Sequence, residues 1–440
     1  MAQDDESVYL NPGHSAPDRP LGPAEKAFLG YERAHPGTNL GIGGLVLFHG
    51  KPPTMAEIYE QAPLRLPEQP LMGCGLTPGS FRQAAWRPRP TLDLTRHCRE
   101  RILPAGSGRA ALLGAVNELL ALPFTQGDPP WRLWIIHGYD DDEFAGLYLG
   151  HHALHDGVSA MKNVGRLMFG ERPETVGPRI PRGTGRPRPL RAALGACRLA
   201  SGLFPPAMKI SDTALTGERR LAWATTSLEL MREIGKRHDT TVNTVYLAAL
   251  TTALREWPDS PWHELQEKGR PLWALVPVST RAGGEHGDTD VRIAPERGRL
   301  PCAEPDPVRR LAILKDVTEP IRASTAVDSE RMLRTRIPRW LSQFVLSQAL
   351  SPRTAHLLAT NVPGIRQPCD ALGRPVREIV PLSFLPAGQR LAVALTCYRD
   401  RACAGFMVDS GHGDAADELA ERWCAAIEEL RTAVPAPSIP

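Results

Sequence analysis

The chain has 440 residues, of which 42% are hydrophobic and 23% are charged. These proportions are typical of globular proteins and exclude a largely disordered chain, and the length favours two lobes of roughly 200 residues each. The formal net charge of +3 is too small to indicate a nucleic-acid-binding surface. No apolar run is long enough to cross a bilayer, and the start MAQDDESVYL is unlike a signal peptide. We therefore expect a cytoplasmic protein without a transmembrane segment.

The eight cysteines are scattered along the chain, and no two form a CxxC pair. In a cytoplasmic protein this distribution favours reduced and mostly buried thiols over disulfides or a zinc site. It also favours such thiols over a catalytic cysteine.

Hydrophobic periodicity predicts most elements of the first half. The predicted helices are 21–33, 55–61, 109–122 and 158–168. The predicted strands are 43–48, 131–136 and 143–150, and we expect the last two to pair antiparallel. Residues 177–190 (GPRIPRGTGRPRPL) predict a linker, because arginine, proline and glycine dominate them and no apolar face can be drawn. This basic run is either a solvated crossover or a contact for phosphate or an acidic membrane.

The second half shows the same interleaving of strands and helices. The predicted strands are 221–228, 273–278, 391–398 and 402–408, of which the last two form a hairpin. The predicted helices are 231–237, 242–257, 306–321, 337–350 and 415–432. Interleaved elements in both halves predict an α/β or α+β fold. We predict a first lobe at 1–175, a crossover linker at 176–220 and a second lobe at 221–440.

The central motif is the run HHALHDG at residues 151–157. It joins the end of a predicted strand to the start of a predicted helix, where a rigid scaffold can hold polar side chains over a cleft. Neighbouring residues of an extended backbone point to opposite faces, so His151 can be structural while His152 faces a substrate. Asp156 precedes the helix and fits its N-cap.

This HHxxxDG run resembles the signature of thioester-dependent acyltransferases, and the chain is most similar to the bacterial wax ester synthase/diacylglycerol acyltransferase family. Five further blocks follow the family's order: LGPAEKAFL at 21–29, DPPWRLW at 128–134, TVNTVYLAAL at 241–250, LVPVSTR at 275–281 and TNVPG at 360–364. The resemblance extends from about residue 21 to 431. It implies a two-lobed fold like that of chloramphenicol acetyltransferase and condensation domains. Each lobe would be a mixed sheet with helices, and an active-site channel would run between the lobes.

The resemblance also implies roles for the motif residues. His152 would be the general base and His151 a structural support. Asp156 would organise the site through a buried pairing with an arginine, which the sequence does not identify. Gly157 would keep the approach to His152 open. His155 is not a motif position and is either a tolerated loop residue or part of the channel lining.

Residues of the other blocks are candidates for substrate binding. Asn243 lies in a predicted helix, where asparagine is a mediocre helix former, so a polar contact is favoured. Asn361 would bond backbone across the channel mouth or hold the pantetheine arm of the donor. Thr360 would donate to the oxyanion; the alternative for this block is a turn set by its Pro-Gly pair. Two aromatic residues complete the predicted substrate-binding set, Trp131 and Trp134.

The predicted reaction moves an acyl group from a coenzyme A thioester to a hydroxyl and forms an ester. It requires a base, an oxyanion partner and positioning in a dry channel. A histidine of ordinary pKa, about 6.5, suits the base, so we expect activity to fall on the acid side near that value. The chain has no GxSxG nucleophile elbow. The three histidines and the aspartate of the motif suggest a metal site, but the strand and Gly157 argue against helical ligand spacing, so we expect no metal.

No tightly bound cofactor is expected. The donor would be a coenzyme A thioester or a phosphopantetheinyl carrier protein, and the acceptor a small alcohol or amine. We expect no nucleic acid partner, and a peripheral contact with lipid stays open.

Four departures from the family pattern bear on the acceptor. Where the family has a histidine before the first strand, the chain has the run NLGIG at 39–43. Pro130 replaces a leucine, Thr244 an aspartate and Ile365 a proline. These changes favour an acceptor from specialised metabolism. The alternatives are carrier-protein-dependent condensation in natural-product assembly, wax ester or triacylglycerol synthesis, and a non-catalytic homologue that binds acyl thioesters.

Overall fold

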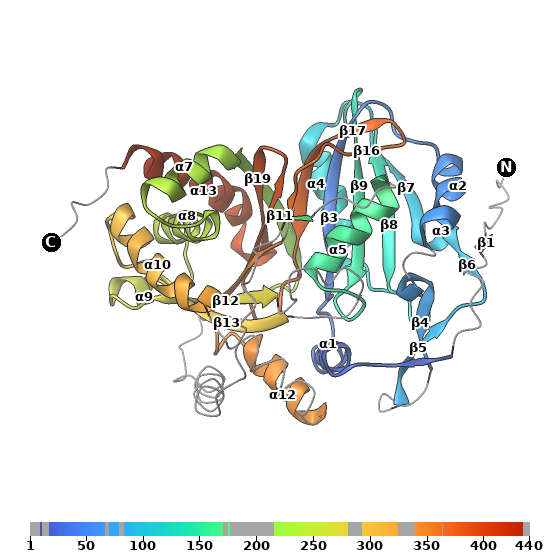
Figure 1. Ribbon diagram of the computed structural model, residues 1–440, viewed down its shortest axis with the longest axis horizontal. Helices are drawn as coiled ribbons and strands as arrows, with labels where there is room; N and C mark the ends of the chain where they lie inside the picture. Colours follow the sequence, from blue (N-terminus) through green and yellow to red (C-terminus); the bar gives the residue numbers. More distant parts are fainter. Residues whose placement is uncertain are drawn as a thin grey trace.

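The computed structural model describes residues 9–10, 17–66, 70–78, 83–169, 175–176, 215–279, 293–323, 339–362 and 364–433. The chain forms two lobes side by side, the first on the right of Figure 1 and the second on the left. Each lobe contains a mixed β-sheet with helices packed on it, as the interleaved pattern predicts. The predicted linker at 177–190 lies outside the described residues, and the predicted domain boundaries stay predictions.

The first-lobe sheet has six strands in the order β16-β17-β3-β9-β8-β7. The bounds are β3 Gly41–His49, β7 Cys98–Ile102, β8 Trp131–His137, β9 Glu143–His151, β16 Asp370–Ala371 and β17 Arg374–Leu382. Strands β8 and β9 pair antiparallel, which confirms the prediction, and β7 runs parallel to β8. Strands β3 and β9 lie in the interior of the sheet and are buried along almost their whole length.

Strand β17 comes from the second half of the chain but pairs antiparallel with β3 of the first lobe, with Leu382 opposite Gly43. The sequence analysis predicted no strand here. The segment RPVREIVPL contains two prolines, and proline removes a backbone donor from a strand, so the local pattern is a poor strand signature. The pairing nevertheless covers one side of β3 and ties the two halves of the chain together through backbone hydrogen bonds.

The second-lobe sheet has eight strands, with β10-β15-β18-β14-β12-β13 along one path and β11 and β19 joined to β18 through β19. The bounds are β10 Thr175–Val176, β11 Arg219–Ser227, β12 Leu272–Ser279, β13 Ile293–Leu300, β14 Leu357–Asn361, β15 Gly364–Ile365, β18 Leu391–Tyr398 and β19 Arg401–Asp409. The antiparallel pairing of β18 with β19 confirms the predicted hairpin. Strands β12, β14 and β18 run parallel to one another.

Helices cover both sheets. Those of the first lobe are α1 Pro23–Ala34, α2 Met55–Arg65, α3 Leu94–His97, α4 Gly108–Ala121 and α5 Gly157–Val164, which a π-turn, Gly165–Phe169, extends. Those of the second half are α7 Leu228–Arg237, α8 Val242–Glu256, α9 His263–Glu267, α10 Pro307–Ala323, α12 Arg339–Ala349 and α13 Ala415–Thr432. Ordinary N-caps start several of them: the side chains of Thr54, Ser227 and Thr241 accept backbone N–H groups at the starts of α2, α7 and α8.

Short strands complete the first lobe. They are β1 Tyr9–Leu10, β2 Arg19–Pro20, β4 Cys74–Leu76, β5 Ala85–Pro88 and β6 Leu92–Asp93. None of the seven cysteines in the described part of the chain forms a disulfide, and five of them are buried.

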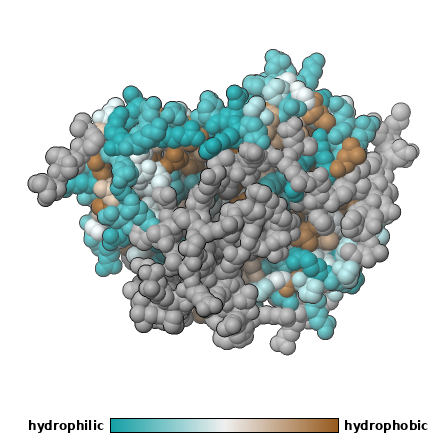
Figure 2. Space-filling view, viewed as in Figure 1, coloured by the Kyte–Doolittle hydropathy of each residue, from teal (hydrophilic) through white to brown (hydrophobic). Residues whose placement is uncertain are grey.

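The visible surface in Figure 2 is hydrophilic along its upper edge, with smaller hydrophobic areas between. The large hydrophobic side chains that are exposed come from different parts of the chain: Leu64, Ile102, Leu122 and Phe344. Of the helices that the structure describes, none is both long enough and apolar enough to cross a membrane.

The close approach of β3 to β9 yields a test of the fold. A Cβ atom added at Gly43 would lie 2.0 Å from the backbone oxygen of Tyr148. We therefore predict that Gly43→Ala lowers the free energy of unfolding by roughly 2 kcal/mol, because the strands must separate locally. Thermal unfolding followed by circular dichroism measures the effect.

The control is Gly114→Ala in the middle of α4, where an added Cβ meets nothing within 4 Å. Alanine is the better helix former by about 1 kcal/mol, so this variant should melt at a higher temperature. A melting temperature of Gly43→Ala equal to that of the native protein would contradict the described packing of β3 on β9.

Candidate active site

The motif residues lie where β9 ends and α5 begins, and residues 151–156 are all buried. Backbone hydrogen bonds hold this turn from two sides. The His151 N–H donates to the Pro130 carbonyl over 2.9 Å, and the His152 N–H donates to the Leu40 carbonyl over 2.9 Å. Pro130 directly precedes β8, and Leu40 directly precedes β3. The sheet therefore sets the position of both histidines before any side chain contributes.

The ring of His152 lies between two phenylalanines. It stacks on Phe28 of α1 with ring centroids 4.1 Å apart and an interplanar angle of 10°, and it meets Phe384 edge-on at 5.4 Å. The residue is 7% exposed. Its Nδ1 atom is enclosed and makes no hydrogen bond with other described residues. The strongest polar influence on the ring that the structure shows is the backbone of His152 itself. The imidazole thus contacts apolar rings on one face and along one edge.

Burial lowers the pKa of His152 to about 4, because the enclosed site disfavours the charged ring. The backbone of His152 itself and the Asp156 carboxylate act in the opposite direction, and burial outweighs both. The expectation of an ordinary pKa near 6.5 is therefore wrong for this state of the protein. At neutral pH the ring is neutral and able to accept a proton.

His151 points away from this apolar setting and makes the contacts of a structural residue. Its Nδ1 accepts a hydrogen bond of 2.9 Å from the Ala153 N–H. Its Nε2 lies 3.2 Å from Oε2 of Glu32, and Phe124 meets its ring edge-on at 5.8 Å. The side chain therefore braces the turn that carries His152.

Asp156 is fully buried and caps α5, as its place before the helix predicts. Its carboxylate accepts a hydrogen bond of 3.0 Å from the Ser159 N–H. The next residue, Gly157, starts the helix. A Cβ added there would lie 3.4 Å from Cγ2 of Val362, so this position faces the TNVPG block of the second half of the chain. A larger side chain at 157 would occupy the space between these two segments.

His155 differs from both alternatives that the sequence analysis left open. It is 1% exposed, and its ring stacks over Tyr148 at 5.8 Å with Nδ1 3.4 Å from Nδ2 of Asn163. A Cβ added at Gly150 would lie 2.1 Å from the ring, so the glycine makes room for it. His155 is therefore a core residue of the first lobe, and burial lowers its pKa to about 3.

Two predicted residues of the second half lie together. Nδ2 of Asn361, at the end of β14, donates to Oδ1 of Asn243 in the first turn of α8 over 3.1 Å. Both side chains are half-buried, as is Thr360. Val362, which follows in the chain, is the residue opposite Gly157. The asparagine pair therefore borders the segment that faces the HHALHDG turn.

Both predicted tryptophans make packing contacts within the first lobe, and their predicted place in the substrate site stays a prediction. Trp131 is 2% exposed, its Nε1 donates to the Met72 carbonyl over 2.7 Å, and its ring stacks on His97 at 4.6 Å. The ring of Trp134 lies under the Arg99 guanidinium at 5.6 Å. Alternation along β8 separates these two side chains onto opposite faces of the sheet.

The sequence analysis did not identify three residues that contact the histidine rings: Phe28, Glu32 and Phe384. The first two lie four residues apart in α1, so they share one helix face. Phe28 lies within the LGPAEKAFL block, so the sequence did indicate that this segment matters for the site. Phe384 follows β17, a strand that the local pattern did not predict.

A cavity of about 770 Å³ lies between the lobes, away from the histidines. Its lining includes Arg109, Trp223, Arg377, Glu378 and Arg401. Glu378 pairs with Leu47 near the end of β3, whereas His151 pairs with Gly41 at its start, so the cavity is at the other end of the strand. Among the residues that the structure describes, no three His, Cys, Asp or Glu side chains are arranged to hold a metal ion.

The chain has a mixed sheet in each of two lobes and a buried histidine pair where β9 ends, and family models of acyltransferases match it. Family models described as the wax ester synthase/diacylglycerol acyltransferase catalytic domain and the WS/DGAT C-terminal domain match residues 21–211 and 297–431. The chain therefore belongs to the wax ester synthase/diacylglycerol acyltransferase family and is an acyltransferase.

Individual proteins of known name or structure are also similar to the chain. A probable diacylglycerol O-acyltransferase of Mycobacterium tuberculosis is 27% identical over 423 residues, which are 88% of this chain and 90% of that protein. The structure of the wax ester synthase/diacylglycerol acyltransferase from Marinobacter aquaeolei has a TM-score of 0.65 at 22% identity and covers 94% of this chain and 100% of its own. The starter condensation domain of rhizomide synthetase in complex with C8-CoA has a TM-score of 0.62 at 13% identity, with 94% coverage of each chain.

The buried histidines make the stability of the protein depend on pH. Burial lowers the pKa values of His152, His155 and His356 to about 4, 3 and 4, whereas an unfolded histidine titrates near 6.5. Between these values the unfolded chain binds more protons than the folded chain, so the free energy of unfolding must fall as the pH decreases. At pH 5 each group contributes at most about 2 kcal/mol of this loss.

We predict a lower urea midpoint at pH 5.0 than at pH 7.5. Replacing one titrating ring by an apolar ring, His155→Phe, should reduce the difference between the two midpoints. Equal midpoints at both pH values in the native protein would show that these rings are not held neutral by the fold.

Proposed function

We propose that the protein transfers an acyl group from a coenzyme A thioester to a hydroxyl group, with His152 as the general base. The observation that carries this proposal is the setting of His152, a neutral imidazole stacked on Phe28 and enclosed at Nδ1. Nε2 is then the nitrogen left to accept a proton from a substrate. We infer that substrates reach this nitrogen from the side of the motif where Gly157 faces Val362.

In this mechanism the hydroxyl oxygen of the acceptor attacks the thioester carbonyl carbon while Nε2 of His152 takes the hydroxyl proton. Collapse of the tetrahedral intermediate breaks the carbon–sulfur bond, and the imidazolium returns the proton to the departing thiolate. The products are an ester and free coenzyme A. The low pKa of the buried ring makes the imidazolium short-lived, which favours its return of the proton. No acyl-enzyme is formed.

The other motif residues position the base. His151 braces the turn through the Ala153 N–H, and Asp156 caps α5. The lack of a side chain at Gly157 avoids crowding between this turn and Val362, which would lie 3.4 Å from an added Cβ. The arginine partner of Asp156 stays a prediction from the resemblance.

The asparagine pair is suited to the pantetheine arm of the donor. With Asn361 Nδ2 bonded to Asn243 Oδ1, the pair presents the remaining Oδ1 of Asn361 as an acceptor and the remaining Nδ2 of Asn243 as a donor. An amide of pantetheine needs one group of each kind. Thr360, half-buried beside Asn361, is the proposed hydroxyl donor to the oxyanion. A related condensation domain was solved with C8-CoA, which supports a coenzyme A donor over a carrier protein.

The acceptor has two candidates. The names of the relatives, diacylglycerol O-acyltransferases at 27% identity, favour a diacylglycerol. The departures from the family pattern favour a hydroxyl or amine of specialised metabolism. Two of the residues that depart from the pattern have buried side chains. Thr244 Oγ1 lies 3.0 Å from Thr318 Oγ1, and Ile365 is 1% exposed. We propose the specialised acceptor, because a few changed residues can redirect substrate choice while the histidine pair is retained.

The role of His152 is tested by His152→Ala. We expect turnover to fall by roughly 100- to 10,000-fold, the usual contribution of a positioned base. The control is His263→Ala, which removes an exposed histidine from α9 and should leave turnover unchanged. Thiol release measures both rates, and circular dichroism checks folding. A loss below tenfold in folded His152→Ala would exclude this residue as the base and favour a homologue that only binds thioesters.

The acceptor is tested by offering the pure enzyme palmitoyl-CoA together with hexadecanol or with a diacylglycerol. For a specialised acceptor we expect slow thiol release with both. A kcat/KM above about 10⁴ M⁻¹s⁻¹ with either substrate would instead identify a bulk-lipid enzyme, because that value is typical of ordinary enzymes with their own substrates.

A further inference from the structure

One face of helix α1 contacts both histidines of the motif. Phe28 stacks on the ring of His152, and the Glu32 carboxylate lies beside Nε2 of His151 at 3.2 Å. These two residues of α1 are one helical turn apart, so a single helix placement sets both contacts.

The hydrogen bond at the other nitrogen shows which tautomer His151 adopts in this structure. Nδ1 accepts the Ala153 N–H over 2.9 Å in a buried setting, and an accepting nitrogen carries no proton. The proton of the neutral ring is therefore on Nε2. That atom is enclosed, and Oε2 of Glu32 lies 3.2 Å from it, a contact that falls short of a linear hydrogen bond.

We propose that Glu32 is a positioning residue that holds His151 in the Nε2–H tautomer and thereby keeps the turn bearing His152 in place. The inference rests on the proposed role of His152 as the base. In the other tautomer, the Nδ1–H of His151 would face the Ala153 N–H, and both buried donors would lose a partner. The turn would have to shift, and His152 is the next residue in it.

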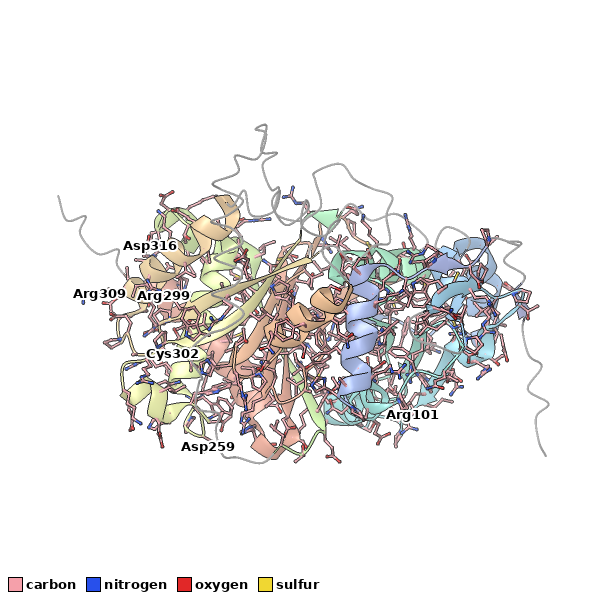
Figure 3. The ribbon with its side chains drawn as sticks, turned by 90° about the horizontal axis from the view of Figure 1, so that it is seen from below. Arg101, Asp259, Arg299, Cys302, Arg309 and Asp316 are labelled. Atoms are coloured by element: carbon pink, nitrogen blue, oxygen red, sulfur yellow. The ribbon has the colours of Figure 1, made fainter. Side chains whose placement is uncertain are left out.

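The placement of α1 depends on the second half of the chain, which extends the inference to the lobe junction. Figures 1 and 3 show α1 beside α12, with Arg101 marking the first lobe and Cys302 the second in Figure 3. Ser342 Oγ of α12 donates to the Pro23 carbonyl, and an added Cβ at Gly30 would lie 2.6 Å from the Gln343 amide. The Tyr31 hydroxyl also accepts the Ala387 N–H over 3.0 Å. Glu32 is thus presented to His151 by a helix that both lobes hold.

A role in positioning predicts a particular kinetic pattern. Glu32 touches the structural histidine and not the proposed base, so its loss should lower kcat and leave KM nearly unchanged. Carboxylates that orient histidines at metal sites typically contribute 10- to 100-fold to activity, and we expect a similar loss of kcat in Glu32→Ala. Glu32→Gln retains a carbonyl oxygen for the Nε2–H and should keep most of the activity. Glu60→Gln, an exposed change on α2, is the matched control.

The tautomer is measured directly by ¹⁵N NMR of the full chain labelled at histidine, with His151 assigned by comparison with His151→Gln. In the native protein at pH 7.5 we expect an unprotonated Nδ1 and a protonated Nε2. Glu32→Ala should show a mixture of both tautomers, Glu32→Gln and Glu60→Gln the native pattern. Melting temperatures establish that each variant is folded.

Several results would overturn the proposal. A protonated Nδ1 in the native protein would do so, as would Glu32→Ala with the native tautomer, whether its kcat is native or reduced. The native spectrum shows whether Nδ1 is protonated even if Glu32→Ala does not fold. In that case Glu32→Gln tests whether an oxygen atom at position 32 is enough to keep the native tautomer. A failure of the proposed function would be seen in a different experiment. An active His152→Ala would exclude His152 as the base without changing the tautomer of His151.

Discussion

The pairing of β9 with β3 is the constraint on which the site depends. It places His151 opposite Gly41 at one end of both strands, and the N–H groups of the two histidines then find backbone acceptors at Pro130 and Leu40. Side chains refine this arrangement but do not create it. Because backbone hydrogen bonds within a buried sheet are rarely left unpaired, the turn has little freedom to move without disturbing three strands. A catalytic group at such a strand end is held by the scaffold itself.

The second constraint comes from the other half of the chain. Strand β17 pairs with β3 on the side opposite β9, and the segment after it brings Phe384 to the edge of His152. Helix α1, which lies against α12, supplies Phe28 and Glu32. The surroundings of the two rings are therefore assembled from both lobes. The way in which the two lobes pack together therefore also determines the surroundings of the histidine rings.

Burial gives the histidines their chemical state. Desolvation lowers the pKa values of His152 and His155, and the buried carboxylate of Asp156 offsets only part of that effect. Neutral rings suit a base that must accept a proton and return it within one turnover. The same burial makes acid unfold the protein more easily, so the setting that favours the chemistry has a cost in stability at low pH. Sites with perturbed pKa values often combine these two properties.

The sequence alone determined the features that depend on neighbouring residues. Periodicity predicted most helices, the antiparallel strands around 131–150 and the hairpin of β18 with β19, and Asp156 was predicted as a cap because capping acts within one helical turn. The ordered motifs indicated the family. Only the tertiary structure decided that β17 joins the first sheet, that Trp131 and His155 are core residues, and that Phe28, Glu32 and Phe384 contact the histidines. These features arise from packing between segments that are far apart in the chain, and a local pattern carries no record of which distant segment will cover it.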